Sequence, residues 1–116
     1  MHLSPLLHGL ANRPEVTGAA VVSAEGLIIQ QLLGSAPDRE ALAALATTLL
    51  RHSTELGTAA GLGGLTTAVL EFSPGPVVVS RLGNGASLVV LVRADADFGE
   101  ILYLVRRHRD ALAELL

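Results

Sequence analysis

Five apolar runs, each bounded by turn residues, predict the strands of a sheet. Short connections such as Gly83-Asn84-Gly85 carry the residues of tight hairpin turns, so neighbouring strands should run antiparallel. The runs do not alternate between apolar and polar residues, as strands with one wet face do. Both faces of the predicted sheet therefore need a cover. The five strands are expected at residues 16–23, 27–33, 65–72, 77–82 and 87–93.

Three segments with helical spacing of their apolar residues supply that cover. The first helix is predicted over 4–12 and the long second helix over 38–57. The third begins at Asp97, which can form a capping box with Glu100, while Asp95 is a rival cap. Two of these helices can cover one face of the sheet and one the other. The pattern predicts a single domain over 1–116 of the α+β class, an α/β sandwich with the order α-β-β-α-β-β-β-α.

The long helix has two different sides. Its leucine-rich side is expected to be buried, and it comprises Leu42, Leu45, Ala46, Leu49 and Leu50. The other side is not plainly charged and carries Ala41, Ala44, Thr47, Thr48 and Arg51. Small residues there would let another backbone approach closely; the alternative is an ordinary exposed face rich in alanine, a good helix former. Arg51 could form an ion pair with a carboxylate of a second copy, such as Glu55, or an ion pair with Glu55 of its own helix.

Composition narrows the classes of function. Half of the 116 residues are hydrophobic and 16% are charged, which suggests apolar surface intended for a partner. Only three residues are aromatic and the net charge is −3, which disfavours nucleic-acid and sugar binding. No cysteine is present to form disulfides or thiolate sites. The first residues lack the features of a signal peptide and no run is long enough to span a membrane, so we expect a cytoplasmic protein.

Candidate chemistry is sparse. The four histidines have no metal-ligand spacing within a helix, although His8 and His108 fall on terminal helices that can be neighbours; His2 and His52 complete the set. The glycine-rich stretch 61–64 lacks the Lys-Ser/Thr ending of a phosphate-binding loop, and no Gly-x-Ser-x-Gly elbow occurs. A cross-strand ion pair between Glu71 and Arg81 is expected. We predict no catalytic, cofactor-binding or metal site, and thus no enzyme.

The chain resembles the Roadblock family, the dynein light chain-like relatives of the longin and profilin-like folds. The resemblance rests on "VTGAAVVSAEGLII", the helix start "DREALAALATTLL", "TAVLEF", "PVVVSRLGNGASLVVLV" and the final "FGEILYLVRR". These segments occur in the right order at about the right spacing and cover nearly the whole chain. Together they are moderately specific, because the family signature is a diffuse apolar pattern with glycine at turns.

The resemblance implies a five-stranded antiparallel sheet of order 2-1-5-4-3, with the two terminal helices on one face and the long central helix on the other. It implies that members homodimerise by pairing their third strands and packing their long helices. It also implies a role as regulator or scaffold of small Ras-like GTPases, including GTPase-activating partners of a bacterial polarity GTPase.

The strand 65–72 fits such a role, because it is β-branched and holds neither proline nor lysine, and an unprotected edge of this kind invites pairing. We therefore predict a homodimer through strand 65–72 and helix 38–57, with no nucleic acid bound, and a small Ras-like GTPase as partner. The alternatives are a scaffold for a signalling complex without a GTPase, such as a sensor kinase, and a small-ligand sensory domain. The predicted interface residues are Ala41, Ala44, Thr48, Arg51, Leu65, Thr67, Val69 and Leu70.

Overall fold

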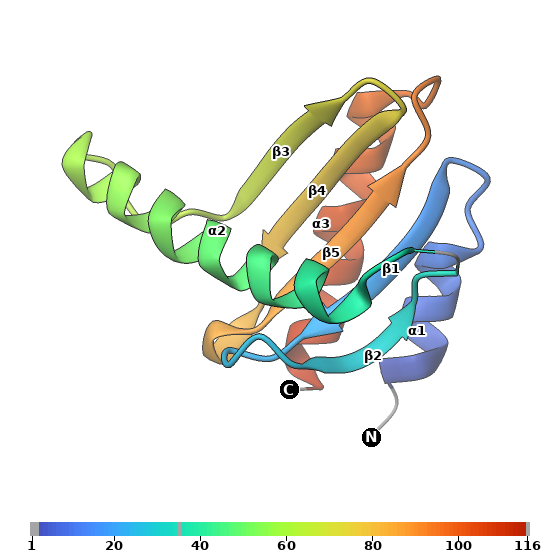
Figure 1. Ribbon diagram of the computed structural model, residues 1–116, viewed down its shortest axis with the longest axis horizontal. Helices are drawn as coiled ribbons and strands as arrows, with labels where there is room; N and C mark the ends of the chain where they lie inside the picture. Colours follow the sequence, from blue (N-terminus) through green and yellow to red (C-terminus); the bar gives the residue numbers. More distant parts are fainter. Residues whose placement is uncertain (1–2, 35, 116) are drawn as a thin grey trace.

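The computed structural model describes residues 3–34 and 36–115, so His2 lies outside the described residues. The elements follow the predicted order, with boundaries shifted by a few residues (Figure 1). The long helix runs two residues further than expected and ends at Ala59. The helices and strands are α1 (Leu3–Ala11), β1 (Val16–Val22), β2 (Ile28–Leu32), α2 (Arg39–Ala59), β3 (Thr67–Phe72), β4 (Gly75–Arg81), β5 (Ser87–Val92) and α3 (Phe98–Glu114), with a short 3₁₀ turn at Gly83–Gly85.

The strands form one antiparallel sheet in the order β2-β1-β5-β4-β3, which confirms the predicted fold class. Two turns use the left-handed conformation that their sequences allow. Gly26 has a φ of 85° between β1 and β2, and Asn84 has a φ of 60° between β4 and β5. Strands β2 and β3 are left as the two edges of the sheet.

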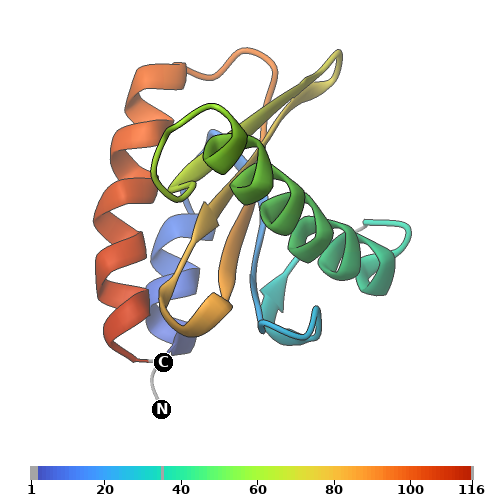
Figure 2. The same cartoon turned by 90° about the vertical axis from the view of Figure 1, so that its left-hand side faces the viewer.

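The helices form two unequal layers, as predicted. Figure 2 shows α1 and α3 together on one side of the sheet and α2 alone on the other. The α1/α3 side holds the larger apolar core, in which Leu7, Leu10, Ile101, Val105 and Leu112 contact one face of the strands. The α2 side has a smaller core, in which its side chains meet the opposite strand face through Ala43, Ala46 and Leu50. Strands apolar on both faces are thus explained by a sheet between helices.

The β3–β4 hairpin is tighter than expected. Phe72 pairs with Gly75, so Ser73-Pro74 alone makes the turn. This register sets Glu71 opposite Pro76 and leaves Arg81 past the other end of β3, so the predicted Glu71–Arg81 ion pair is wrong. Gly75 has a φ of 150°, and a Cβ there would collide with a backbone oxygen of β5. The register is therefore fixed by a position that only glycine fills easily.

The start of α3 resolves the choice between two caps. Asp97 accepts a hydrogen bond from the backbone N–H of Glu100 at 3.2 Å, so it is the N-cap. Asp95 accepts instead from Arg93 Nη2 at 3.0 Å. The Glu100 carboxylate does not complete a capping box, because it accepts from Arg13 Nη2 at 2.8 Å and so joins α3 to the segment after α1.

Candidate interaction surface

The β3 strand is an open edge with a defined hydrogen-bonding phase. Its neighbour is β4 on one side, and no described strand pairs with its other side. The backbone N–H of Arg81 donates to the carbonyl of Thr66 at 2.8 Å, which makes this a hydrogen-bonded pair. Because such pairs alternate along an antiparallel ladder, the backbone N–H and C=O groups of Thr67, Val69 and Glu71 point away from β4. A second strand could pair with these groups.

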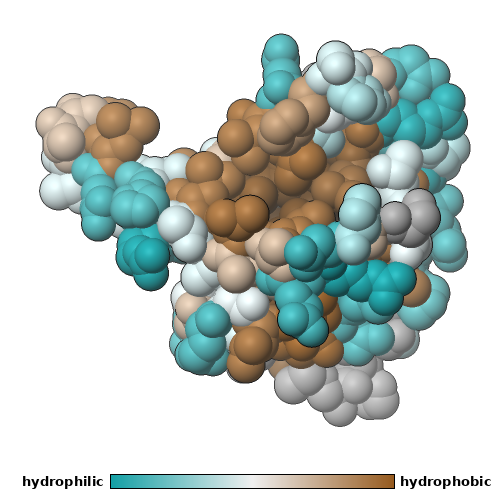
Figure 3. All heavy atoms as spheres, viewed as in Figure 1, coloured by the Kyte–Doolittle hydropathy of each residue, from teal (hydrophilic) through white to brown (hydrophobic). Residues whose placement is uncertain are grey.

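An apolar groove adjoins this edge on the α2 side. It measures about 570 Å³ and is floored by Leu70, Phe72, Val77, Val79 and Val89 of three strands. Its wall is the flank of α2 that carries Leu42, Leu45 and Leu49. Figure 3 shows the resulting hydrophobic area hollowed between α2 and the strands. Groups of exposed apolar residues such as this one are typical of interaction sites.

The groove exists because α2 buries small residues. Ala43, Ala46 and Leu50 face the sheet. Of the leucine-rich side predicted to be buried, Ala46 and Leu50 are buried, and Leu42, Leu45 and Leu49 lie on the flank that walls the groove. Leu45, expected in the core, is 66% exposed, so that prediction is wrong. Alanines let the helix approach the sheet closely, and the longer leucines then project sideways over β3 and β4. The apolar side of the helix covers a wider arc than contact with one sheet requires. That width is the feature of the sequence that could have predicted an exposed apolar flank.

The last turns of α2 extend beyond the sheet. Figure 1 shows the end of the helix projecting past β3 before the chain returns to that strand. Leu56 and Leu62 on this projecting arm are each 70% exposed. The return is tight, because Leu62 N–H donates to the Gly57 carbonyl at 2.8 Å and a Cβ on Gly57 would lie 2.9 Å from the Gly63 carbonyl oxygen. The arm therefore presents apolar side chains that its own sheet does not cover.

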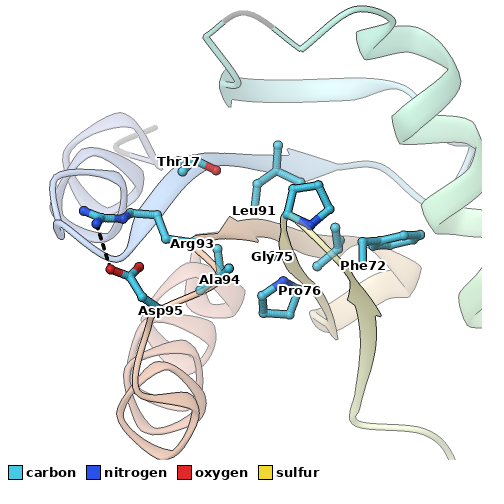
Figure 4. Close-up of a pocket in the computed structure, with 11 residues that line it drawn as sticks. Thr17, Phe72, Gly75, Pro76, Leu91, Arg93, Ala94 and Asp95 are labelled. Atoms are coloured by element: carbon cyan, nitrogen blue, oxygen red, sulfur yellow. Dashed lines mark hydrogen bonds and ion pairs between the residues drawn. The ribbon is translucent and has the colours of Figure 1, made fainter.

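A second hollow of about 660 Å³ lies at the far end of the same sheet face. It shares Phe72 and Val77 with the groove and reaches Thr17 and Leu91 (Figure 4). Its polar end is formed by Arg93 and Asp95, whose side chains form an ion pair with each other (Nη2 to Oδ2, 3.0 Å). The α2 side of the sheet is thus uncovered continuously from the groove to the Arg93–Asp95 ion pair.

The predicted interface residues fall into two groups in space. Thr67, Val69 and Leu70 lie on the open edge, and Leu65 precedes it. On α2, Ala41 and Thr48 face outward beside the groove wall and are half-buried. Ala44 lies instead against the chain's own β1–β2 turn, where a Cβ on Gly26 would come within 3.4 Å of its Cα.

Arg51 is exposed on the same side of α2 as Ala44. Glu55 lies 3.2 Å from His52 Nδ1, and among the described residues no ion pair joins it to Arg51. The intrahelical Arg51–Glu55 pair is therefore not made.

Possible metal ligands were compared over the described residues, 3–34 and 36–115. Within them no group of three or more His, Asp or Glu side chains is placed to hold a metal ion. His8 and His108 do lie on packed helices: a Cβ on Gly9 of α1 would be 3.8 Å from His108 Nε2. His108 also contacts the Leu104 carbonyl through Nδ1 at 2.9 Å. No helix in the described part of the chain is both long and apolar enough to span a membrane.

A helix-flanked antiparallel sheet with an open edge at β3 and an apolar groove beside that edge is typical of small domains that bind other proteins. The sequence model of the Roadblock/LC7 domain matches residues 4–92, and the chain belongs to this family. No curated protein matched by sequence.

Solved structures show the same fold. A Roadblock/LC7 domain from Streptomyces avermitilis is 31% identical, with a TM-score of 0.70 and coverage of 100% of this chain and 99% of that one. MglB of Myxococcus xanthus is 16% identical, with a TM-score of 0.89 over 97% and 86% of the two chains. An MglB described with a tetrameric arrangement is 19% identical, with a TM-score of 0.87 over 97% and 86%.

Proposed function

We propose that the chain acts as a single-domain, cytoplasmic, homodimeric adaptor that binds a small Ras-like GTPase and performs no chemistry of its own. The observation that carries the proposal is the open β3 edge with the apolar groove directly beside it. An edge with free backbone groups gives a partner strand its hydrogen bonds, and the groove gives it apolar area to bury. A second copy of the chain has both an edge strand that can pair with β3 and apolar side chains that can be buried in the groove.

The two edges of the sheet differ in a way that favours β3. The β1–β2 ladder is interrupted by an irregularity between Val21 and Val22, and bulges of this kind disrupt pairing at an edge. The β3–β4 ladder is regular from Thr67 to Phe72. A regular, unbulged strand is the better template for another strand, so the dimer is proposed at β3.

In this dimer a two-fold axis would pass through the β3 edge, and each contact would occur twice. The two α2 helices would then lie on the same side of a continuous sheet. The arm that carries Leu56 would extend over the second copy, toward the groove walled by Leu45 and Leu49. The proposed interface comprises Leu65, Thr67, Val69 and Leu70 on the edge, with Ala41, Ala44, Thr48 and Arg51 contributed by α2.

The GTPase as partner is supported by membership of the Roadblock/LC7 family and by the fold shared with MglB. A scaffold for a signalling complex without a GTPase would present the same domain, and the experiment below separates the two. The open, apolar groove has few polar groups to orient a small molecule, which favours a protein partner over a metabolite.

The test is binding of small Ras-like GTPases from the source genome, loaded with GDP or with a non-hydrolysable GTP analogue, to the purified chain by calorimetry. We expect one nucleotide state to bind at least tenfold more tightly than the other. A well-folded dimer that binds no GTPase in either state would contradict the GTPase role and leave the scaffold role. Nucleotide hydrolysis by the GTPase is measured in parallel to detect any change in rate.

A further inference from the structure

Arg109 of α3 lies at the open β3 edge, on the face opposite the groove. Its Nη1 is 3.5 Å from both Thr67 Oγ1 and Ser80 Oγ, and its side chain is 22% exposed. The two hydroxyls bond each other at 3.0 Å, and Ser80 Oγ also donates to the Thr66 carbonyl at 3.3 Å. The only carboxylate near the guanidinium among the described residues is that of Asp110, at 3.7 Å from Nε.

Glu71 lies on the same strand and the same face as Thr67. Side chains alternate along a strand, so Thr67, Val69 and Glu71 share a face. This is the α3 face, because Val69 is paired with Val78, which belongs to the core under α1 and α3. Glu71 is exposed, and no described residue forms an ion pair with it.

The hydrogen-bonding phase of β3 restricts how two copies can pair. Within β3, only Thr67, Val69 and Glu71 offer backbone groups to a second strand, so in a β3–β3 pairing these residues must be matched with one another. A two-fold register centred on Val69 uses all three in each copy. A shift by one ladder step in either direction leaves one of them without a strand residue opposite. A register centred on Glu71 would set two like charges face to face, which is unfavourable.

We propose that two copies pair antiparallel about Val69 and that Arg109 of each forms an ion pair with Glu71 of the other. In this register Thr67 lies directly opposite the second copy's Glu71, on the face where Arg109 already contacts Thr67 Oγ1. Cβ atoms opposite each other on neighbouring strands are about 5 Å apart, well within the reach of an arginine and a glutamate. The pair is partly buried and charge-assisted, and it selects the second copy and the register together. This inference rests on the proposed homodimer.

Charge reversal tests the ion pair. Glu71→Arg and Arg109→Glu should each raise the dimer dissociation constant by about tenfold or more, equivalent to about 1.4 kcal/mol. The double variant should restore tight association, because it exchanges the charges without changing the geometry. Association is measured by sedimentation equilibrium, and folding by circular dichroism. Arg107→Glu, a reversal on the exposed side of α3 where the guanidinium lies 6.0 Å from the Tyr103 ring, is the matched control and should leave the dimer intact.

Cysteine cross-linking tests the register directly. The chain contains no cysteine, so a single introduced thiol reports one position. Oxidised Val69→Cys should give a disulfide-linked dimer, since paired Cα atoms there are about 5.5 Å apart and disulfides span roughly 4.4–6.8 Å. Thr67→Cys and Glu71→Cys should each fail to self-link but should cross-link with each other when mixed.

The outcomes separate the register from the dimer itself. If Val69→Asp stays dimeric while folded, the β3 dimer of the proposed function is wrong. If Val69→Asp is monomeric but both charge reversals associate as tightly as the parent chain, or the double variant is no tighter than the single ones, the ion pair is refuted. Self-linking of Thr67→Cys or Glu71→Cys would place the two-fold axis elsewhere and refute the register.

Discussion

The two faces of the sheet are covered by different amounts of helix. On one face α1 and α3 lie side by side, and Leu7, Leu88 and Leu112 are fully buried between them and the strands. On the other face α2 crosses alone, and Phe72 at the end of β3 is 57% exposed. The strands are apolar on both faces, so the difference in burial comes mainly from how many helices reach each face. One face is complete within a single chain, and the other is left open for a partner.

The largest effect should come from the closed face. Leu112→Ala removes a fully buried side chain from α3 and should lower the free energy of unfolding by about 2–5 kcal/mol. Chemical denaturation at a chain concentration below the dimer dissociation constant measures the loss. Leu45→Ala, the same truncation on the open side, is the control and should change the free energy by no more than about 0.5 kcal/mol. Equal losses would mean that the open face is packed as well as the closed one.

An intermediate effect is expected where α2 does contact the sheet. Leu50 of α2 is buried between the helix and the sheet. Leu50→Ala should therefore lower the free energy of unfolding by about 2 kcal/mol, the lower end of the range for leucine truncations. The adjoining groove lets neighbouring side chains and water relax into the space, which reduces the cavity contribution. A loss larger than that of Leu112→Ala, in the same denaturation series, would reverse the ranking of the two faces.

The helix caps give a comparison that should not depend on the face. Asp38 accepts from the Ala41 N–H at 3.0 Å at the start of α2, and Asp97 plays the same part at the start of α3. Asp38→Ala and Asp97→Ala should each cost about 1 kcal/mol, because each leaves one helix N–H without its acceptor. Thermal unfolding followed by circular dichroism would show midpoint shifts of similar size. A much larger shift for one of them would point to a second role for that carboxylate.

The smallest effect on folding should accompany a clear effect on assembly. Leu45→Ser replaces an exposed leucine of the groove wall, and its unfolding free energy should change by about 0.5 kcal/mol or less when measured below the dimer dissociation constant. Sedimentation equilibrium should show weaker self-association. Thr47→Ser, a mild change on the flank of α2 that lies beside the chain's own Gly26 and outside the proposed interface, provides the matched control. Unchanged association of the Leu45→Ser chain would exclude the groove wall from the dimer contact.

Much of the fold could be predicted from local pattern. The unbroken apolar character of the strands required helices on both sides, and glycine and asparagine in the turns set the hairpins. The sequence left two candidate N-caps for α3, Asp95 and Asp97. The structure decides for Asp97, because its carboxylate is the one that accepts from the Glu100 N–H. The ion pair expected between Glu71 and Arg81 failed because a two-residue turn moved the register, and turn length is poorly specified when Ser73-Pro74-Gly75-Pro76 can all belong to a turn.

The sequence by itself determined the class of fold, the order of its elements and, through the resemblance, the family. It could not determine which side of α2 would face the sheet, because alanines and leucines are both apolar and both fit a helix. Tertiary packing decided this: Ala43 and Ala46 bring the helix close to the strands, and Leu45 is left beside the β3 edge. The position of Arg109 next to Thr67 likewise depends on residues 42 positions apart, which only the packed α3 helix brings together.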